Sequence, residues 1–263
     1  MLDPQKTTIE FCVFDQLDST HTFSLQKDWS EKLNPNHVVV VVAGEQTQGI
    51  GSHNRKWLSS GVAFHVNVNF YSDKLLPFSQ IASYTVCQAL MEEFHKGFTL
   101  KMKWPNDIFV NGGKIGGCIC HTKSMDEGYF VTVGIGINFN YAPDLEIKTQ
   151  SIYKILKRQT FFTFEDIFLF IQNFSQLFVQ NLYWYSRLNL SLFFEDCKPF
   201  WLYLGEKVAV FDEDLCQWVQ GKFIKVTQEG RLNLQTPEGS SLFILNGTQM
   251  QLTDKNSFFT EVN

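Results

Sequence analysis

The residues best suited to catalysis or ligand binding are Asp107 and Lys114, a carboxylate and an ammonium group in one short segment. An apolar run after Asp107 ends in Asn111-Gly112, the pair that favours a two-residue β-hairpin turn. With that turn, Phe109 pairs with Lys114 and Asp107 pairs with Gly116, which places the two charged side chains on one face as diagonal neighbours. A three-residue turn would place them on opposite faces, and Lys114 would then be an ordinary solvated lysine.

The residues around this pair favour a lysine that faces a ligand. Trp104-Pro105-Asn106 precedes Asp107, and because Pro105 has no amide hydrogen, the incoming strand must end or bend there. Gly116 and Gly117 follow the lysine and leave that face bare, so a ligand can lie against the backbone. These features favour a Lys114 that faces a ligand over one that is simply solvated.

Apolar patterning predicts a main sheet with helices packed against it. Residues 37–43 contain five consecutive valines, which is typical of a strand buried on both faces. We expect further strands at 9–15, 61–70 and 129–140, and helices at 20–30, 77–94, 164–188 and 193–201. From residue 205 the pattern changes to short alternating segments at 207–211, 217–226, 231–235 and 241–245, which predict a small all-β domain.

A long polar loop, residues 44–57, follows the valine-rich strand. A long loop between two strong strands is more often functional than idle. The loop lacks both the P-loop pattern and the third glycine of the dinucleotide fingerprint. It ends in Arg55-Lys56-Trp57, which offers two cations for phosphates beside an aromatic side chain.

Composition narrows the function classes. The chain has 263 residues, 44% apolar, and a net charge of −5, which argues against DNA binding driven by overall charge. Six scattered cysteines, with no charged and apolar leader, predict reduced thiols in the cytoplasm. The aromatic run at 161–192 is interrupted by polar side chains every few residues, so we expect no membrane span. Cys118-x-Cys120-His121 lacks the second pair of ligands that a zinc site needs. We expect these cysteines to be small residues of the core.

These motifs together resemble a known family. Lys103-Trp104-Pro105-Asn106-Asp107, followed by Lys114 and Gly116-Gly117, resembles the catalytic core of biotin–protein ligases. Leu17-Asp18-Ser19-Thr20, the 46–57 loop and Gly134-Ile135-Gly136-Ile137-Asn138 recur in the family's order, so that the resemblance covers residues 9–200 loosely. It implies an α+β fold with a mixed central sheet and flanking helices. The implied domains are a biotin/lipoate ligase-like catalytic domain at 1–203 and a C-terminal SH3-like β-barrel at 204–263. We expect the monofunctional type, without an N-terminal DNA-binding domain and without DNA as a partner.

The resemblance implies ATP-dependent ligation of biotin to a lysine of a biotin carboxyl carrier protein, as in acetyl-CoA carboxylase, through biotinyl-5′-AMP. ATP, Mg²⁺ and biotin are the implied small molecules. A lipoate or octanoate ligase on the same fold is the nearest alternative, although the Arg-Arg-x-Gly-Gly-Gly loop of those enzymes is missing from the sequence. A non-catalytic module that binds a biotinylated or lipoylated carrier is an alternative of a different class.

The same resemblance assigns roles to individual residues. Ser19, Thr20 and Asn138 also have a simpler reading, as helix and turn caps. The implied catalytic residues are Lys114, Arg55 and Asp107, with Asp107 also an indirect contact of Mg²⁺. The implied biotin-binding residues are Ser19, Thr20, Gln46, Gly49, Trp57, Lys114, Gly116 and Gly117, and the implied nucleotide-binding residues are Arg55, Lys56, Trp57, Asn106 and Asn138.

The 44–57 loop departs from the family pattern, which is rich in arginine where this chain has Ile50, Ser52, His53 and Asn54. Fewer cations remain to hold an anionic adenylate. We therefore predict that a chain with Ile50→Arg and Ser52→Arg releases biotinyl-5′-AMP more slowly than the unmodified chain. The measurement is the rate at which labelled adenylate leaves the protein, and equal rates for the two chains would contradict the prediction.

Overall fold

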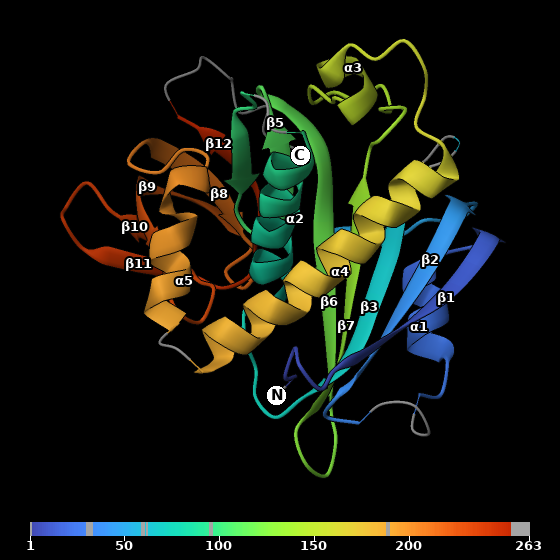
Figure 1. Cartoon of the computed structure of the whole chain (residues 1–263). Helices are drawn as coiled ribbons and strands as arrows, with labels where there is room; N and C mark the ends of the chain where they lie inside the picture. The colour runs from blue at the N-terminus through green and yellow to red at the C-terminus, as the bar shows by residue number, and fades with distance from the viewer. Residues whose placement is uncertain are drawn as a thin grey trace.

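The structure, a computed structural model, describes residues 2–29, 34–58, 61, 63–94, 97–187 and 190–253. Its larger sheet has seven strands in the order β1-β2-β3-β7-β6-β5-β4 (Figure 1). β1 and β2 are parallel and the other neighbours are antiparallel, which confirms the predicted mixed sheet. The strands are β1 (Thr8–Leu17), β2 (His37–Gln46), β3 (Phe64–Ser72), β4 (Leu100–Lys103), β5 (Asp107–Val110), β6 (Gly113–Ser124) and β7 (Tyr129–Ile137).

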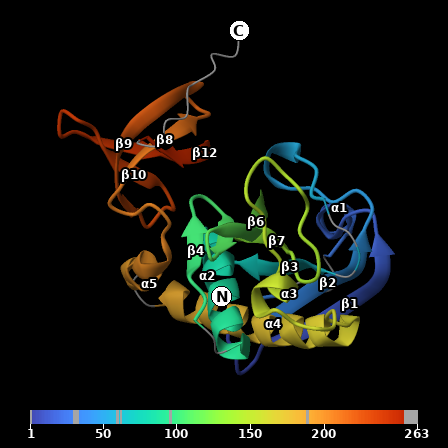
Figure 2. The same ribbon diagram turned by 90° about the horizontal axis from the view of Figure 1, so that it is seen from above.

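Helices cover both faces of this sheet. α2 (Phe78–Phe94) and α4 (Phe164–Arg187) lie on one face, and the short α1 (Thr20–Gln26) lies on the other (Figures 1 and 2). α3 (Ile152–Leu156), α5 (Leu190–Cys197) and two 3-10 turns, η1 (Ser52–Asn54) and η2 (Lys198–Phe200), complete the helical elements of the described residues. No helix in the described ranges is long and apolar enough to cross a membrane. Ser30, Val62 and Leu188, which the predicted elements include, lie outside the described residues.

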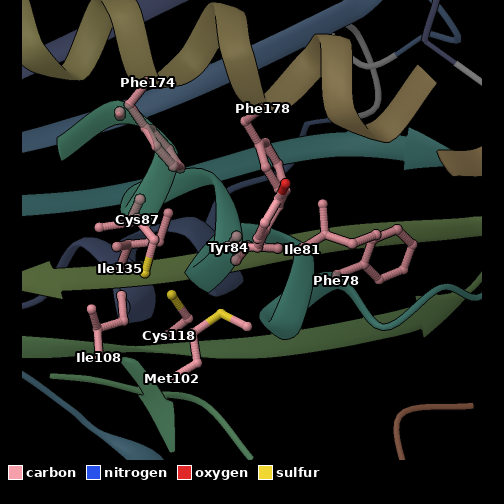
Figure 3. Packing of buried hydrophobic residues seen from close by; sticks show 14 of the residues in the cluster. Phe78, Ile81, Tyr84, Cys87, Met102, Ile108, Cys118, Ile135, Phe174 and Phe178 are labelled. Atoms are coloured by element: carbon pink, nitrogen blue, oxygen red, sulfur yellow. The ribbon is translucent and has the colours of Figure 1, made fainter. Parts of the chain in front are cut away.

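The main core lies between the sheet and the pair α2 and α4. Phe170, Phe174 and Phe178 recur every fourth residue of α4 and form one apolar stripe. Phe174 and Phe178 reach toward the buried face of α2, and side chains of the sheet close the other side (Figure 3). The abundant phenylalanines are therefore explained by packing. The residues labelled in Figure 3 are Phe78, Ile81, Tyr84, Cys87, Met102, Ile108, Cys118, Ile135, Phe174 and Phe178.

The face of the sheet under α1 is buried and carries polar side chains beside a small apolar cluster that includes Val39 and Val41. Val38 to Val42 of β2 have no exposed surface, as the run of valines predicts. On the neighbouring β3, His65, Asn67 and Asn69 are at most 1% exposed and alternate with the apolar residues of the main core. This strand is therefore covered on both faces, and its polar side chains lie between the sheet and α1.

A second, five-stranded sheet follows, in the order β11-β10-β9-β8-β12, and every neighbouring pair is antiparallel. Its five strands are labelled in Figure 1. β11 and β12, its edge strands, are not paired with one another within the described residues, so a closed SH3-like barrel is not seen. The division at residues 203 and 204 stays a prediction. The strands are β8 (Lys207–Asp212), β9 (Gln217–Val226), β10 (Leu232–Gln235), β11 (Ser241–Ile244) and the unpredicted β12 (Gly247–Leu252).

Trp104 joins the two sheets. It is 2% exposed, and its indole N–H donates to the backbone oxygen of Gly230 at 2.9 Å. Gly247 lies so close to the ring that a Cβ there would be 2.9 Å from Cζ3 of Trp104. The tryptophan in Trp104-Pro105-Asn106-Asp107 therefore has a packing role, and it places the following residues beside the second sheet.

His65 makes the stability of the fold depend on pH. Both ring nitrogens are buried, and burial lowers the pKa of His65 from 6.5 to about 4 against a smaller, opposing interaction with the backbone of Ala43. Between these two values the unfolded chain binds a proton that the folded chain does not, so stability falls as pH falls. The full effect is about 3 kcal/mol.

We predict that His65→Phe reduces the loss of stability between pH 6.5 and pH 4, measured as the free energy of unfolding in urea at several pH values. His121→Gln, at an exposed histidine of β6, is the control and should leave the dependence unchanged. An unchanged pH dependence in His65→Phe would refute the prediction.

Candidate active site

The β5–β6 hairpin has the predicted two-residue turn. Asn111 and Gly112 have φ values of 48° and 76°, and both are positive as a type I′ turn requires. Val110 pairs with Gly113, and Phe109 pairs with Lys114. The local residue types therefore predicted this end of the hairpin correctly.

The register further from the turn was predicted wrongly. Asp107 pairs with Gly117 instead of Gly116, because a β-bulge leaves Ile115 as an extra residue on β6. The bulge lies where β6 changes its partner on the side away from β5. Lys114 bridges to Thr149, whereas the residues from Gly116 onward pair with β7.

The bulge leaves Asp107 and Lys114 in contact. Lys114 Nζ lies 2.5 Å from Asp107 Oδ1, and the two side chains are 20% and 27% exposed. Lys103 pairs with Asp107 from the other side, on β4. Burial lowers the pKa of Lys103, the Asp107 carboxylate opposes that shift and the Lys114 ammonium adds to it. The single carboxylate therefore balances two neighbouring lysines.

A cavity of about 280 Å³ lies between the hairpin, the 44–57 loop and the polar face of the sheet. Its described lining has three lysine or arginine side chains and one carboxylate, so it suits an anionic ligand. Most residues of the predicted site meet here although they come from distant parts of the chain. The predicted residues that line it are Thr20, Gln46, Arg55, Lys56, Trp57, Asn106, Asp107, Lys114, Gly117 and Asn138.

Three predicted site residues, Ser19, Gly49 and Gly116, are not part of the lining. Ser19 is the N-cap of α1, and its Oγ accepts from the N–H of Thr22 at 3.3 Å. A Cβ on Gly49 would lie 2.8 Å from the backbone oxygen of Trp57, and one on Gly116 would lie 2.3 Å from that of Gly136. Capping and close backbone packing explain these three positions.

The polar end of the cavity is formed by Thr20 and Gln46. The N–H and the hydroxyl of Thr20 both donate to Gln46 Oε1, at 2.7 and 3.0 Å. This pair connects the start of α1 with the end of β2, because Gln46 is the last residue of that strand. Both residues line the cavity and give this end of it a polar surface.

The 44–57 loop folds back on itself. The N–H of Trp57 donates to the backbone oxygen of Gly49 at 2.8 Å, and the Arg55 guanidinium donates to Ser52 Oγ at 2.7 Å. The Trp57 ring lies against Gly136, where a Cβ would be 2.7 Å from Cε2. At the tip, η1 places His53 Nδ1 3.2 Å from Glu213 Oε1 in the turn after β8. The loop therefore contacts both sheets.

The two asparagines assigned to nucleotide binding also hold the walls of the cavity together. The amide of Asn106 donates to the backbone oxygen of Cys118. Asn138 donates through its side chain to the oxygen of Gln150 at 3.3 Å, and through its backbone to that of Ile115 at 2.7 Å. Each side chain is thus fixed at the edge of the cavity.

Other residues of the lining were not predicted. The segment after β7 contributes an apolar wall, and Leu145 and Ile147 in it are 45% and 47% exposed. Alternating apolar residues in an otherwise irregular segment were the available signal. His21 and Asn67 had none, because only the packing of α1 on β3 brings them to the cavity. The unpredicted lining residues are His21, Ile50, Gly51, Ser52, Leu58, Asn67, Cys118, Ile119, Gly134, Ile135, Gly136, Pro143, Leu145, Ile147 and Thr149.

The fold is α+β, and a hairpin lysine and a cationic loop surround a pocket that suits an anionic ligand. Residues 13–138 match the model of the Biotin/lipoate A/B protein ligase family. This match covers a little under half of the chain, and within it the chain has a domain of the biotin/lipoate ligase family.

Individual relatives agree with this assignment. Biotin–protein ligase 2 of Arabidopsis thaliana is 29% identical over 158 residues, which are 53% of this chain and 47% of that protein. Biotin–[acetyl-CoA-carboxylase] ligase of Paracoccus denitrificans is 31% identical over 109 residues, 40% of this chain and 45% of that protein. The matches thus span about half the length of these relatives.

The solved structures extend the likeness in fold to almost the whole chain. Biotin protein ligase from Aquifex aeolicus, solved in complex with biotin and ATP, has a TM-score of 0.75 and 24% sequence identity. The alignment covers 93% of this chain and 99% of that one. Since this coverage extends well beyond residues 13–138, the second sheet belongs to the shared architecture.

Proposed function

We propose that this chain is a biotin–protein ligase, which activates biotin with ATP and transfers it to a lysine of a carrier protein. One observation carries the proposal. The Lys114 ammonium group, held 2.5 Å from Asp107 Oδ1, lines the same cavity as Arg55, Lys56 and Trp57. Cations from two distant segments therefore surround one space, as two anionic substrates require.

In the first step, a carboxylate oxygen of biotin attacks the α-phosphorus of ATP. The bond from that phosphorus to the bridging oxygen breaks, and pyrophosphate leaves with the electron pair. Negative charge grows on the α-phosphoryl oxygens, and a fixed ammonium group stabilises it without reorganising. We assign this role to Lys114, with Asp107 as the group that orients it.

In the second step, the neutral amine of an acceptor lysine attacks the acyl carbon of biotinyl-5′-AMP. The acyl–oxygen bond breaks, AMP leaves as an anion, and the amine loses its proton to solvent. The enzyme needs no nucleophile of its own. We propose a biotin carboxyl carrier protein as the acceptor, such as that of acetyl-CoA carboxylase, which the name of the Paracoccus denitrificans relative mentions.

The remaining assignments follow the two ends of the cavity. Arg55 and Lys56 would bind phosphates, and Trp57 would cover the ligand. Asn106 and Asn138 would contact the nucleotide, and Thr20 with Gln46 would bind the polar ring of biotin. Ser19, Gly49 and Gly116 would support this shape from behind.

Mg²⁺ is proposed as the ion that accompanies ATP. Mg²⁺ at phosphate sites keeps several waters and uses one or two carboxylates, and Asp107 is the carboxylate in the described lining. Bound there with the phosphates, the ion would neutralise charge on the departing pyrophosphate.

We also propose a C-terminal SH3-like domain from residue 204. The proposed location is the cytoplasm, where cysteines such as the six free ones here stay reduced.

We predict that Lys114→Ala lowers the rate of biotin-dependent exchange between pyrophosphate and ATP about 10²–10³-fold, because the transition state loses a fixed cation. Lys123→Ala is the matched control, since Lys123 is exposed on the same strand and does not line the cavity. Exchange at a near-normal rate in Lys114→Ala would remove the lysine from its assigned role.

We further predict that the unmodified chain exchanges pyrophosphate with ATP in the presence of biotin and not of lipoate or octanoate. Exchange only with lipoate or octanoate would assign the chain to the other branch of its family. Exchange with none of the three, by a protein that still binds a carrier, would support a non-catalytic binding module.

A further inference from the structure

Asn67 is an unassigned polar residue of the cavity. It lies on β3, has no exposed surface, and belongs to the cavity lining. Its side-chain oxygen, Oδ1, is buried and has no hydrogen-bond donor. An unpaired buried acceptor is costly, so an oxygen of this kind beside a ligand cavity needs an explanation.

A chain of hydrogen bonds determines which way the amide of Asn67 points. Asn69 Nδ2 donates to the backbone oxygen of Val39 at 3.1 Å, and because that oxygen only accepts, the orientation of the Asn69 amide is set. Asn69 Oδ1 then accepts the hydroxyl of Thr132 at 2.7 Å. Thr132 Oγ1 has used its proton, so it must accept from Asn67 Nδ2.

His21 lies on the same side of the amide as Thr132. Asn67 Nδ2 is 3.4 Å from His21 Nδ1, and burial lowers the pKa of His21 while the contact with Asn67 raises it. Since Nδ2 faces Thr132 and His21, Oδ1 is the part of the amide that remains for another donor. A flipped amide would place this oxygen against Thr132 Oγ1, which has no proton left to donate.

The oxygen lies at the wall of the cavity. A Cβ on Gly134 would be 2.8 Å from Asn67 Oδ1 and 3.2 Å from His21 Nδ1, and all three residues line the cavity. The bare backbone of Gly134 therefore leaves room for the oxygen beside the ligand space. Thr20 forms part of the same lining, on the side that we assign to the polar ring of biotin.

We infer that Asn67 Oδ1 accepts a hydrogen bond from a ring N–H of the acyl substrate and thereby selects a cyclic urea over acids whose far end has no N–H. This inference rests on the proposed function, because it specifies how that site chooses its substrate. A dithiolane ring or a plain acyl chain would bury the oxygen unpaired, and a site built in this way rejects such ligands strongly.

The test compares ligands and variants in the pyrophosphate exchange assay with the full chain. Asn67→Leu, which is nearly isosteric and has no acceptor, should raise the KM for biotin about 10–100-fold with kcat within about 3-fold. In the unmodified chain, at least one of the two singly N-methylated biotins should bind correspondingly worse than biotin. In Asn67→Leu that difference should disappear, and selectivity against lipoate should fall.

Asn181→Leu is the matched control, because Asn181 is a buried amide between α4 and α2 that does not line the cavity. It should leave the KM for biotin unchanged. If Asn67→Leu does not fold, Asn67→Ala replaces it, and the comparison of methylated biotins with the unmodified chain still applies.

The outcomes separate two failures. No exchange with biotin by the unmodified chain overturns the proposed function. Exchange with biotin, together with an unchanged KM and unchanged ligand selectivity in the Asn67 variant, overturns this inference alone. Equal binding of biotin and both methylated biotins by the unmodified chain also overturns it.

Discussion

The contact between Lys114 and Asp107 is the interaction on which the site depends. The path of the β6 backbone brings the two side chains together. β6 bridges to the segment at Thr149 on one side of its bulge and to β7 on the other. Ile115, the extra residue of the bulge, lies between these two paired segments of β6 and is fully buried. As a result Lys114 and Gly117, which are three residues apart in the sequence, pair with residues two apart on β5, and both line the cavity. A regular hairpin would have placed Gly116 there instead.

The polar layer beneath α1 is the second constraint. A strand with Asn67 and Asn69 in its interior is costly unless nearly every donor and acceptor is paired. Here Val39, Ser24, Thr132 and His21 provide partners across β2, α1 and β7. The layer therefore joins three elements and sets the orientation of the amides at the cavity wall. An apolar layer would have packed as well, but it would have left no preference for a polar ligand.

The second sheet is connected to the site through Trp104 and the 44–57 loop. The indole of Trp104 contacts the second sheet immediately before the residues that open the hairpin. His53 at the loop tip pairs with Glu213 after β8. The loop tip thus touches the second sheet through this contact, although an exposed pair of this kind contributes little stability by itself.

The sequence by itself determined the elements and the chemistry that they carry. Five valines predicted β2, and an aromatic run interrupted by polar side chains predicted α4. Asn111-Gly112 predicted the turn that brings Lys114 back toward Asp107. These predictions succeed because local backbone preferences and apolar patterning act over short distances. Only the tertiary structure decided the bulge at Ile115, the separation of Gly117 from Gly116, the burial of Asn67 and the pairing of β12. Each of these depends on which distant strand lies alongside, and the energy of such a contact is not encoded in the residues of either segment alone.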